Sequence, residues 1–172
     1  MRHLMIALAV ALTAALAASA TGHAADTPAA LKTRHGKIGT FLVDGHGRTL
    51  YLFQKDKTTR STCSGACATD WPPLLTSGKA KASGSVRKAL LGTTKRSDGS
   101  TQVTYKGHPL YLFTSDTGAG QISGQRQNFF GGKWYAVSAT GSANKLAPPT
   151  GGGTTTSTTT TGTTDCGIYG CP

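Results

Sequence analysis

Residues 47–56 read GRTLYLFQKD, and residues 107–116 read GHPLYLFTSD. The two stretches share the pattern G-x-x-L-Y-L-F-x-x-D at an offset of 60 positions. The same offset pairs Leu31 with Leu91 and Val43 with Val103 without a gap, whereas Trp71 matches Trp134 after a short insertion. A chance repeat of this length is very improbable, so the chain contains two diverged copies of one unit.

Each copy has the pattern of short strands separated by glycine-rich turns. Apolar or alternating residues occupy 38–43 and 49–53 in the first copy, and 101–105, 110–113 and 133–138 in the second. Successive strand residues point to opposite faces, and both faces of the Leu-Tyr-Leu-Phe segments are apolar, so we expect these two segments to be central. The sequence predicts an all-β fold in which two duplicated antiparallel β units form a small barrel or sandwich around a pseudo-twofold axis. Residues 86–91 are a weak helix candidate.

The two ends of the chain differ from this middle part. Residues 1–25 have a charged start, an apolar run over 4–17 and small residues after it, which predicts a cleaved signal peptide and a secreted or periplasmic protein. The run is shorter than the roughly 20 residues of a transmembrane helix, and no lipobox Cys follows it. We place the duplicated β domain at residues 26–145, with repeats at about 31–74 and 91–138. Residues 146–172 are rich in Thr and Gly, and we expect a disordered tail.

The charge balance is strongly basic. Lys and Arg number 18 against 7 acidic residues, all of them Asp, which gives a net charge of +11. Such a field attracts polyanions, so anionic envelope polymers or surfaces are the expected partners. The cations are spread singly along the chain, and an ordinary cationic surface is the simpler interpretation. No motif for specific nucleic-acid binding is present.

Four cysteines form two close pairs, Cys63 with Cys67 and Cys166 with Cys171. In an exported chain an even count indicates disulfides, and local pairing is the most economical of the three arrangements. A redox dithiol or a metal site is the alternative. Redox motifs are usually C-x-x-C, and His35, His46 and His108 lack the spacing of zinc ligands, so we expect no metal and no cofactor.

The motif aspartates and the aromatic residues each have two interpretations. Asp56 and Asp116 could form the acid/base pair of a hydrolase, or each could cap the turn after its strand, which its presence in both copies favours. The aromatic residues could line a ligand groove or form the core of a small β domain, and we favour the core. They are Tyr51, Phe53, Trp71, Tyr111, Phe113 and Trp134. Nucleophile elbow, phosphate-binding loop and metalloprotease motifs are absent, so we expect no enzyme.

Several motifs resemble those of one bacterial family. The Y-x-F-x-x-D pattern at residues 51–56 and 111–116, the C-x-G-x-C-A-x-x-W-P-P-L segment at residues 63–74 and the segment at residues 130–135 are similar to the family called secreted repeat of unknown function, many of whose members are predicted lipoproteins. The resemblance covers about residues 37–138 and implies no particular activity. We therefore expect an exported, non-catalytic, envelope-associated binding or structural module. The alternative is a redox or metal-handling accessory protein that uses Cys63 and Cys67.

Overall fold

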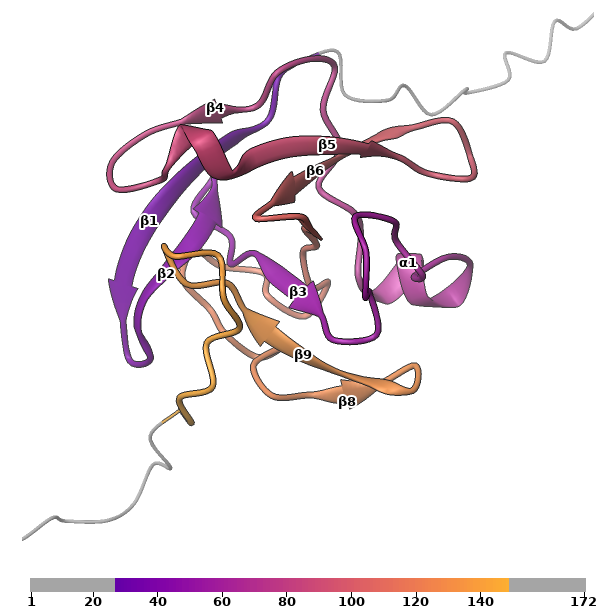
Figure 1. Cartoon of the computed structure of the whole chain (residues 1–172). Coiled ribbons are helices and arrows are strands. Elements are labelled where there is room, and N and C mark those ends of the chain that lie inside the picture. The colour runs from indigo at the N-terminus through magenta and orange to yellow at the C-terminus, as the bar shows by residue number, and fades with distance from the viewer. Residues whose placement is uncertain (1–26, 149–172) are drawn as a thin grey trace, which may run out of the picture.

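Strands dominate residues 27–148, the part of the chain that the computed structural model describes (Figure 1). The elements are β1 (Ala30–Gly36), β2 (Gly39–Asp44), β3 (Tyr51–Phe53), α1 (Ala66–Asp70), β4 (Lys81–Ala82), the 3-10 turn η1 (Lys88–Leu90), β5 (Leu91–Lys95), β6 (Thr101–Tyr105), β7 (His108–Pro109), β8 (Asn128–Phe129) and β9 (Gly132–Ala136). The predicted all-β fold is confirmed. The predicted signal peptide, most of the predicted tail and the pair Cys166 and Cys171 lie outside the described residues.

The strands form three small sheets, in the orders β2-β1-β4, β3-β9-β8 and β5-β6-β7. The antiparallel hairpins β1–β2 and β5–β6 are the equivalent parts of the two copies. Single bridges join the sheets to one another, such as Phe41 to Ser138 and Tyr51 to Tyr111. In Figure 1 the strands surround a common interior, with β1 and β2 on one side, β5 and β6 above and β9 below.

The interior contains two apolar clusters, one on each face of the central segments. Leu50 and Leu52 belong to the first cluster, together with Leu110 and Leu112 of the other copy. The aromatic residues between them belong to the second cluster. Both faces of the central segments are therefore covered, as the alternation in the sequence predicts.

The second Leu-Tyr-Leu-Phe segment is central but is not a regular strand. Tyr111 forms isolated bridges to Tyr51 and Pro73, whereas β3 pairs with β9 over three residues. Proline has no N–H to donate to a ladder, and prolines lie both before this segment, at Pro109, and on its neighbour, at Pro73. The prediction of a regular strand at residues 110–113 is therefore wrong, although the segment is central as predicted.

The structure also corrects the ungapped alignment of the copies. Thr33 faces Leu42 in the first hairpin, and Thr93 faces Val103 in the second. Val103 is therefore equivalent to Leu42 and not to Val43. The first hairpin closes at the pair Gly36 and Gly39, and the second has one more residue in its loop. The alignment of the two copies returns to an offset of 60 at the shared motif, residues 47–56 and 107–116.

Candidate functional site

Each repeat donates a tyrosine hydroxyl to the aspartate of the other repeat. The Tyr51 hydroxyl donates to Oδ2 of Asp116 at 2.5 Å, and the Tyr111 hydroxyl donates to Oδ2 of Asp56 at 2.6 Å. All four residues are buried. The repeated motif is therefore a cross-repeat pair, because neither copy supplies both partners of one hydrogen bond.

The two tyrosines also pair through their backbones. The N–H of Tyr51 donates to the carbonyl oxygen of Tyr111 at 2.8 Å, and the N–H of Tyr111 donates to that of Tyr51 at 2.9 Å. This reciprocal geometry places a pseudo-twofold axis between the two residues. The copies meet at their most similar segments.

The second oxygen of each aspartate holds the loop that follows it. Oδ1 of Asp56 accepts from the backbone N–H and the hydroxyl of Thr62, at 2.7 and 2.6 Å. Oδ1 of Asp116 accepts from the backbone N–H of Ser123 at 2.8 Å. Each carboxylate thus fixes its own loop and the tyrosine of the other copy.

The environment of both tyrosines keeps them protonated. Burial, followed by the hydrogen bond and charge of Asp116, raises the pKa of Tyr51 far above its usual value. Burial, followed by the charge and hydrogen bond of Asp56, raises the pKa of Tyr111 in the same way. A neutral hydroxyl donates a hydrogen bond to a carboxylate, whereas a phenolate would repel it. The pairs are therefore suited to structural hydrogen bonding.

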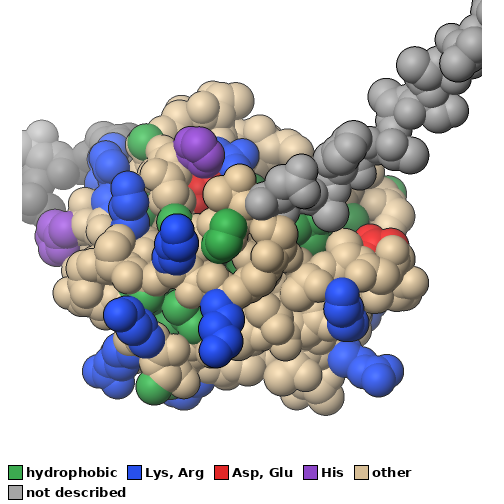
Figure 2. Space-filling model, turned by 90° about the horizontal axis from the view of Figure 1, so that it is seen from above, with side chains coloured by type: hydrophobic (Ala, Val, Ile, Leu, Met, Phe, Trp, Pro, Cys, Tyr) green, Lys and Arg blue, Asp and Glu red, His purple; other side chains and the backbone are tan. Residues whose placement is uncertain are grey.

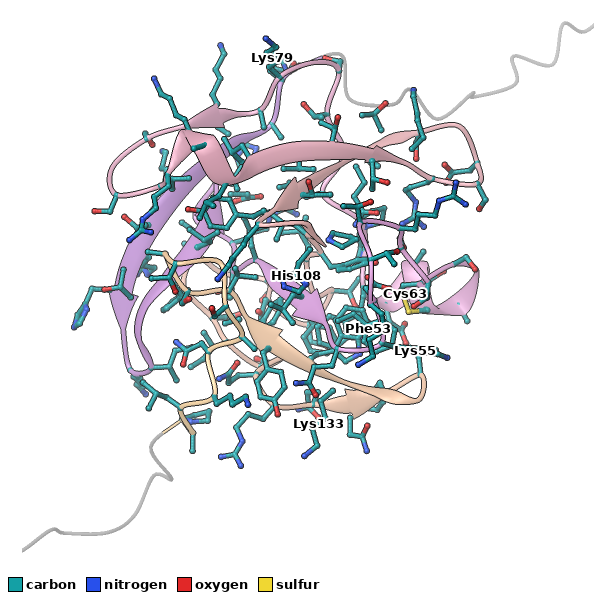
Figure 3. All side chains as sticks on the ribbon, in the orientation of Figure 1. Phe53, Lys55, Cys63, Lys79, His108 and Lys133 are labelled. Atoms are coloured by element: carbon teal, nitrogen blue, oxygen red, sulfur yellow. A yellow bond between two sulfur atoms is a disulfide. The ribbon has the colours of Figure 1, made fainter. Side chains whose placement is uncertain are left out.

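The aromatic residues form a symmetric stack of rings. Phe53 stacks on Trp134 at 4.1 Å, Trp134 on Trp71 at 4.0 Å and Trp71 on Phe113 at 4.1 Å. The ring of Tyr51 meets Trp71 edge-on at 5.4 Å, and that of Tyr111 meets Trp134 edge-on at 5.1 Å. Both tryptophans and both tyrosines are fully buried, so these rings belong to the core, and the partly buried Phe113 packs against them. Figure 3 shows Phe53 within this bundle of rings.

A disulfide joins Cys63 and Cys67 across the start of α1, with a Cα–Cα distance of 5.2 Å. Cys63 is 1% exposed and Cys67 is 6% exposed, and both pack in the cluster that contains Trp71. Figure 3 places the sulfur of Cys63 beside α1. Thiol exchange needs access to a sulfur atom, so this burial favours a structural bond.

The same loop has a second tie that the sequence did not indicate. The Arg96 guanidinium donates to the carbonyl oxygen of Cys63 at 2.8 Å, to Oγ of Ser61 at 2.9 Å and to Oε1 of Gln102 at 2.8 Å. The other copy has Gly36 at the position of Arg96. A Cβ atom there would lie 3.1 Å from the ring of Phe41, which occupies the position of Gln102. The space at this position is therefore filled by a polar network around Arg96 in the second copy and by the ring of Phe41 in the first.

Metal-binding clusters are absent from residues 27–148, where no group of three or more His, Cys, Asp or Glu side chains gathers. His35 is bonded to Thr40 on the β1–β2 hairpin, and His46 is exposed in the turn after β2. His108 lies in β7 (Figure 3). The three histidines come from separate turns and strands.

A hollow of about 530 Å³ lies beside β8 and β9. We call it the four-lysine hollow, because Lys55, Lys57, Lys133 and Lys145 line it. Its other lining residues are neutral and include Gln54 and Asn128, and no carboxylate is among them. This arrangement offers ammonium and amide donors to an anion.

A second basic hollow, of about 840 Å³, lies between β4 and β5. Lys79, Lys81 and Lys88 border it, and Ala82 and Leu91 contribute an apolar part. Figure 3 shows Lys79 at the opposite end of the molecule from Lys133. Figure 2 looks down on the β4–β5 side and shows Lys and Arg spaced singly over it. We call this feature the β4–β5 hollow.

One comparison with known proteins gives a match. The profile of a family described as a secreted repeat of unknown function matches residues 32–75 and 92–138, one match for each copy. No curated protein sequence and no solved structure matches the chain. The helices of residues 27–148 are too short or too polar to cross a membrane.

Proposed function

The chain belongs to this family of secreted repeats, and from that premise we propose that it is an exported, non-catalytic module that binds anionic components of the cell envelope. The four-lysine hollow carries the proposal, because four cations meet there without a neutralising carboxylate. Phosphate and carboxylate groups, which envelope polymers carry in series, are the complementary ligands.

The distribution of the acidic residues supports the proposal. Asp44, Asp56 and Asp116 are buried, and Asp44 is also paired with Arg48 at 2.8 Å. Among the described residues only Asp70 and Asp98 hold exposed carboxylates. The surface is therefore more basic than the net charge of the chain suggests.

A non-catalytic role fits the state of the motif residues. Asp56 and Asp116 each accept a tyrosine hydroxyl and a loop N–H, and such engaged carboxylates are poor candidates for acid/base chemistry. The buried disulfide gives the redox or metal-handling alternative little support. Thiol titration and metal analysis of the purified protein would test that alternative directly.

Binding of polyphosphate, a soluble anionic polymer, tests the proposal. The variant K57Q/K133Q/K145Q removes three lysines from the four-lysine hollow, and K79Q/K81Q/K88Q removes three from the β4–β5 hollow as a matched control. We expect the first variant to bind about tenfold more weakly, equivalent to roughly 1.4 kcal/mol. The control should change the dissociation constant much less, and binding should weaken as salt rises. Equal losses in the two variants would mean that net charge alone attracts the polymer.

A further inference from the structure

The β8–β9 hairpin has a turn that its residues do not favour. Phe129 faces Gly132 across the hairpin, and the two residues between them have positive φ, 56° at Phe130 and 78° at Gly131. A two-residue turn with positive φ at both positions is of type I′, for which Asn-Gly is preferred. Bulky side chains rarely adopt this left-handed conformation. Phe130 is therefore held at a position that is strained for it.

The strained residue stays partly exposed to solvent. Phe130 is 38% exposed and its neighbour Phe129 is 48% exposed. Leu146 is the other large exposed hydrophobic residue among those described. A strained residue that remains more than a third exposed points to a function that requires the side chain at the surface.

Cations lie beside the backbone of this hairpin. The ammonium group of Lys55 donates to the carbonyl oxygen of Phe130 at 3.5 Å. Asn128, Gly131 and Lys133, all from the same hairpin, line the four-lysine hollow. Figure 3 shows Lys133 beneath β8 and β9 and Lys55 near the end of this hairpin. Two exposed phenylalanines and the lysines of the four-lysine hollow thus lie on or beside the same hairpin.

This combination selects among anionic partners. A soluble polyanion would contact the lysines but would leave the phenyl rings in water. A lipid bilayer offers both an acyl region for the rings and negatively charged headgroups for the lysines. Resting on the proposed function and narrowing its ligand, we propose that the β8–β9 hairpin is a membrane-docking element. Phe129 and Phe130 enter the interface of an anionic lipid bilayer, and the four-lysine hollow binds the headgroups.

Sedimentation with vesicles tests this proposal on the purified exported protein. The vesicles contain phosphatidylcholine with phosphatidylglycerol, and vesicles of phosphatidylcholine alone give the uncharged reference. We expect the wild type to bind the charged vesicles, and F129S/F130N to bind them at least about tenfold more weakly. K57Q/K133Q/K145Q should also lose binding, whereas K79Q/K81Q/K88Q should keep most of it.

Two further controls separate docking from folding. The side chain of Leu146 lies near Gly39 of the β1–β2 turn and is not part of the four-lysine hollow, so L146S should bind vesicles as the wild type does. F130N creates the favoured Asn-Gly turn and should raise the melting temperature while it weakens vesicle binding. A folding defect would lower both quantities.

The outcomes distinguish this inference from the function on which it rests. Wild type that binds polyphosphate but not charged vesicles would overturn membrane docking and leave the proposed function intact. Protein that binds neither would overturn both. Vesicle binding that is unchanged in F129S/F130N, or lost equally in L146S, would show that the hairpin is not the docking element.

Discussion

At the scale of single residues, two phenolic hydroxyls hold the copies together. Asp116 is 3% exposed, and the Tyr51 hydroxyl is the partner of its Oδ2 atom. Removing a hydrogen bond to a buried charged group costs about 1.5–3 kcal/mol. We therefore expect Tyr51→Phe to lower the free energy of unfolding by about this amount, and Tyr111→Phe to act similarly, both measured by urea denaturation.

Tyr105→Phe is the matched control for these substitutions. The Tyr105 hydroxyl bonds only neutral backbone groups, the carbonyl of Ala139 and the N–H of Arg87. Its removal should cost about 1 kcal/mol, the usual value for a neutral hydrogen bond. A loss as large as that of Tyr51→Phe would argue against a special role for the tyrosine–aspartate pairs.

The raised pKa values of Tyr51 and Tyr111 make stability depend on pH. Because folding raises the pKa of Tyr51 and Tyr111 above the value of 10.0, each tyrosine holds its proton more tightly in the folded state. Their contribution to stability is complete below about pH 10 and falls as the pH rises further, since the unfolded state then releases protons. Above about pH 10, each of the two tyrosines should lower the free energy of unfolding by about 1.4 kcal/mol for every pH unit.

Alkaline titration with tyrosinate absorbance as the readout checks this dependence. Absorbance should rise in two stages, an early one from accessible tyrosines and a later one that coincides with loss of structure. Tyr51→Phe should make the decline of stability with pH shallower. Ionisation of all tyrosines without unfolding would contradict the raised pKa values.

At the scale of elements, strands with buried residues can be predicted from the sequence, whereas mostly exposed strands cannot. The strand expected at residues 101–105 is β6, in which residues 102–105 are all buried. Strands β1 and β5 were not expected, because only Leu31 is buried in β1 and no residue is fully buried in β5. Their polar, exposed residues are fixed by pairing with β2 and β6, and periodicity in one segment carries no record of its partner.

Local sequence also missed the features that distinguish the copies. The weak helix candidate at 86–91 is the short turn η1, and α1 is too short for a helical period to be visible. The contact of Arg96 with Cys63 joins residues 33 positions apart. Motif and composition suffice to predict the Cys63–Cys67 disulfide and the burial of the aromatic residues other than Phe113, which is only partly buried. They do not reveal which residues of the other copy these side chains contact.

The Cys63–Cys67 disulfide should contribute modestly to stability. It encloses a short loop, so it should stabilise by less than the roughly 3 kcal/mol of a 15-residue loop. The Arg96 guanidinium also holds the carbonyl of Cys63, so the loop keeps one tie without the disulfide. We expect C63S/C67S to melt at a lower temperature but to keep its fold and its binding of polyphosphate.

Arg96→Gln in the C63S/C67S background removes the second tie. Because both ties act on one loop, we expect the combined variant to lose more stability than the two separate changes added together. The measurement is the melting temperature of C63S/C67S, of Arg96→Gln and of the combined variant. A C63S/C67S protein that folds normally and yet loses all binding would instead place the function at these thiols.

At the scale of the whole molecule, the two copies are interleaved rather than placed side by side. Strand β3 of the first copy pairs with β9 of the second, and the stack of rings alternates between the copies. Neither copy therefore contains a complete core. Duplication here produced one domain, in which each half is the folding partner of the other.

This interleaving predicts that neither half folds alone. Ser77, Gly78 and Lys79 are exposed between the copies, so residues 27–78 and 79–148 form natural fragments. Alone, each would expose half of the ring stack and leave one motif aspartate without its tyrosine, and chains this short depend on every part of a small core. We expect each fragment to lack a cooperative thermal transition and their equimolar mixture to regain one.

Tryptophan fluorescence follows this assembly, because each fragment contains one of the two tryptophans, Trp71 or Trp134. Mixing should bury both rings against each other and shift their emission towards shorter wavelengths. Tyr51→Phe in the first fragment should weaken the association, because the hydroxyl bonds Asp116 of the second. Tyr105→Phe in the second fragment should weaken it less, since that hydroxyl bonds residues of its own copy. A single fragment that melts cooperatively near the melting temperature of the whole chain would mean that one repeat is a domain by itself, and that the reciprocal tyrosine–aspartate bonds join two folded units instead of completing one.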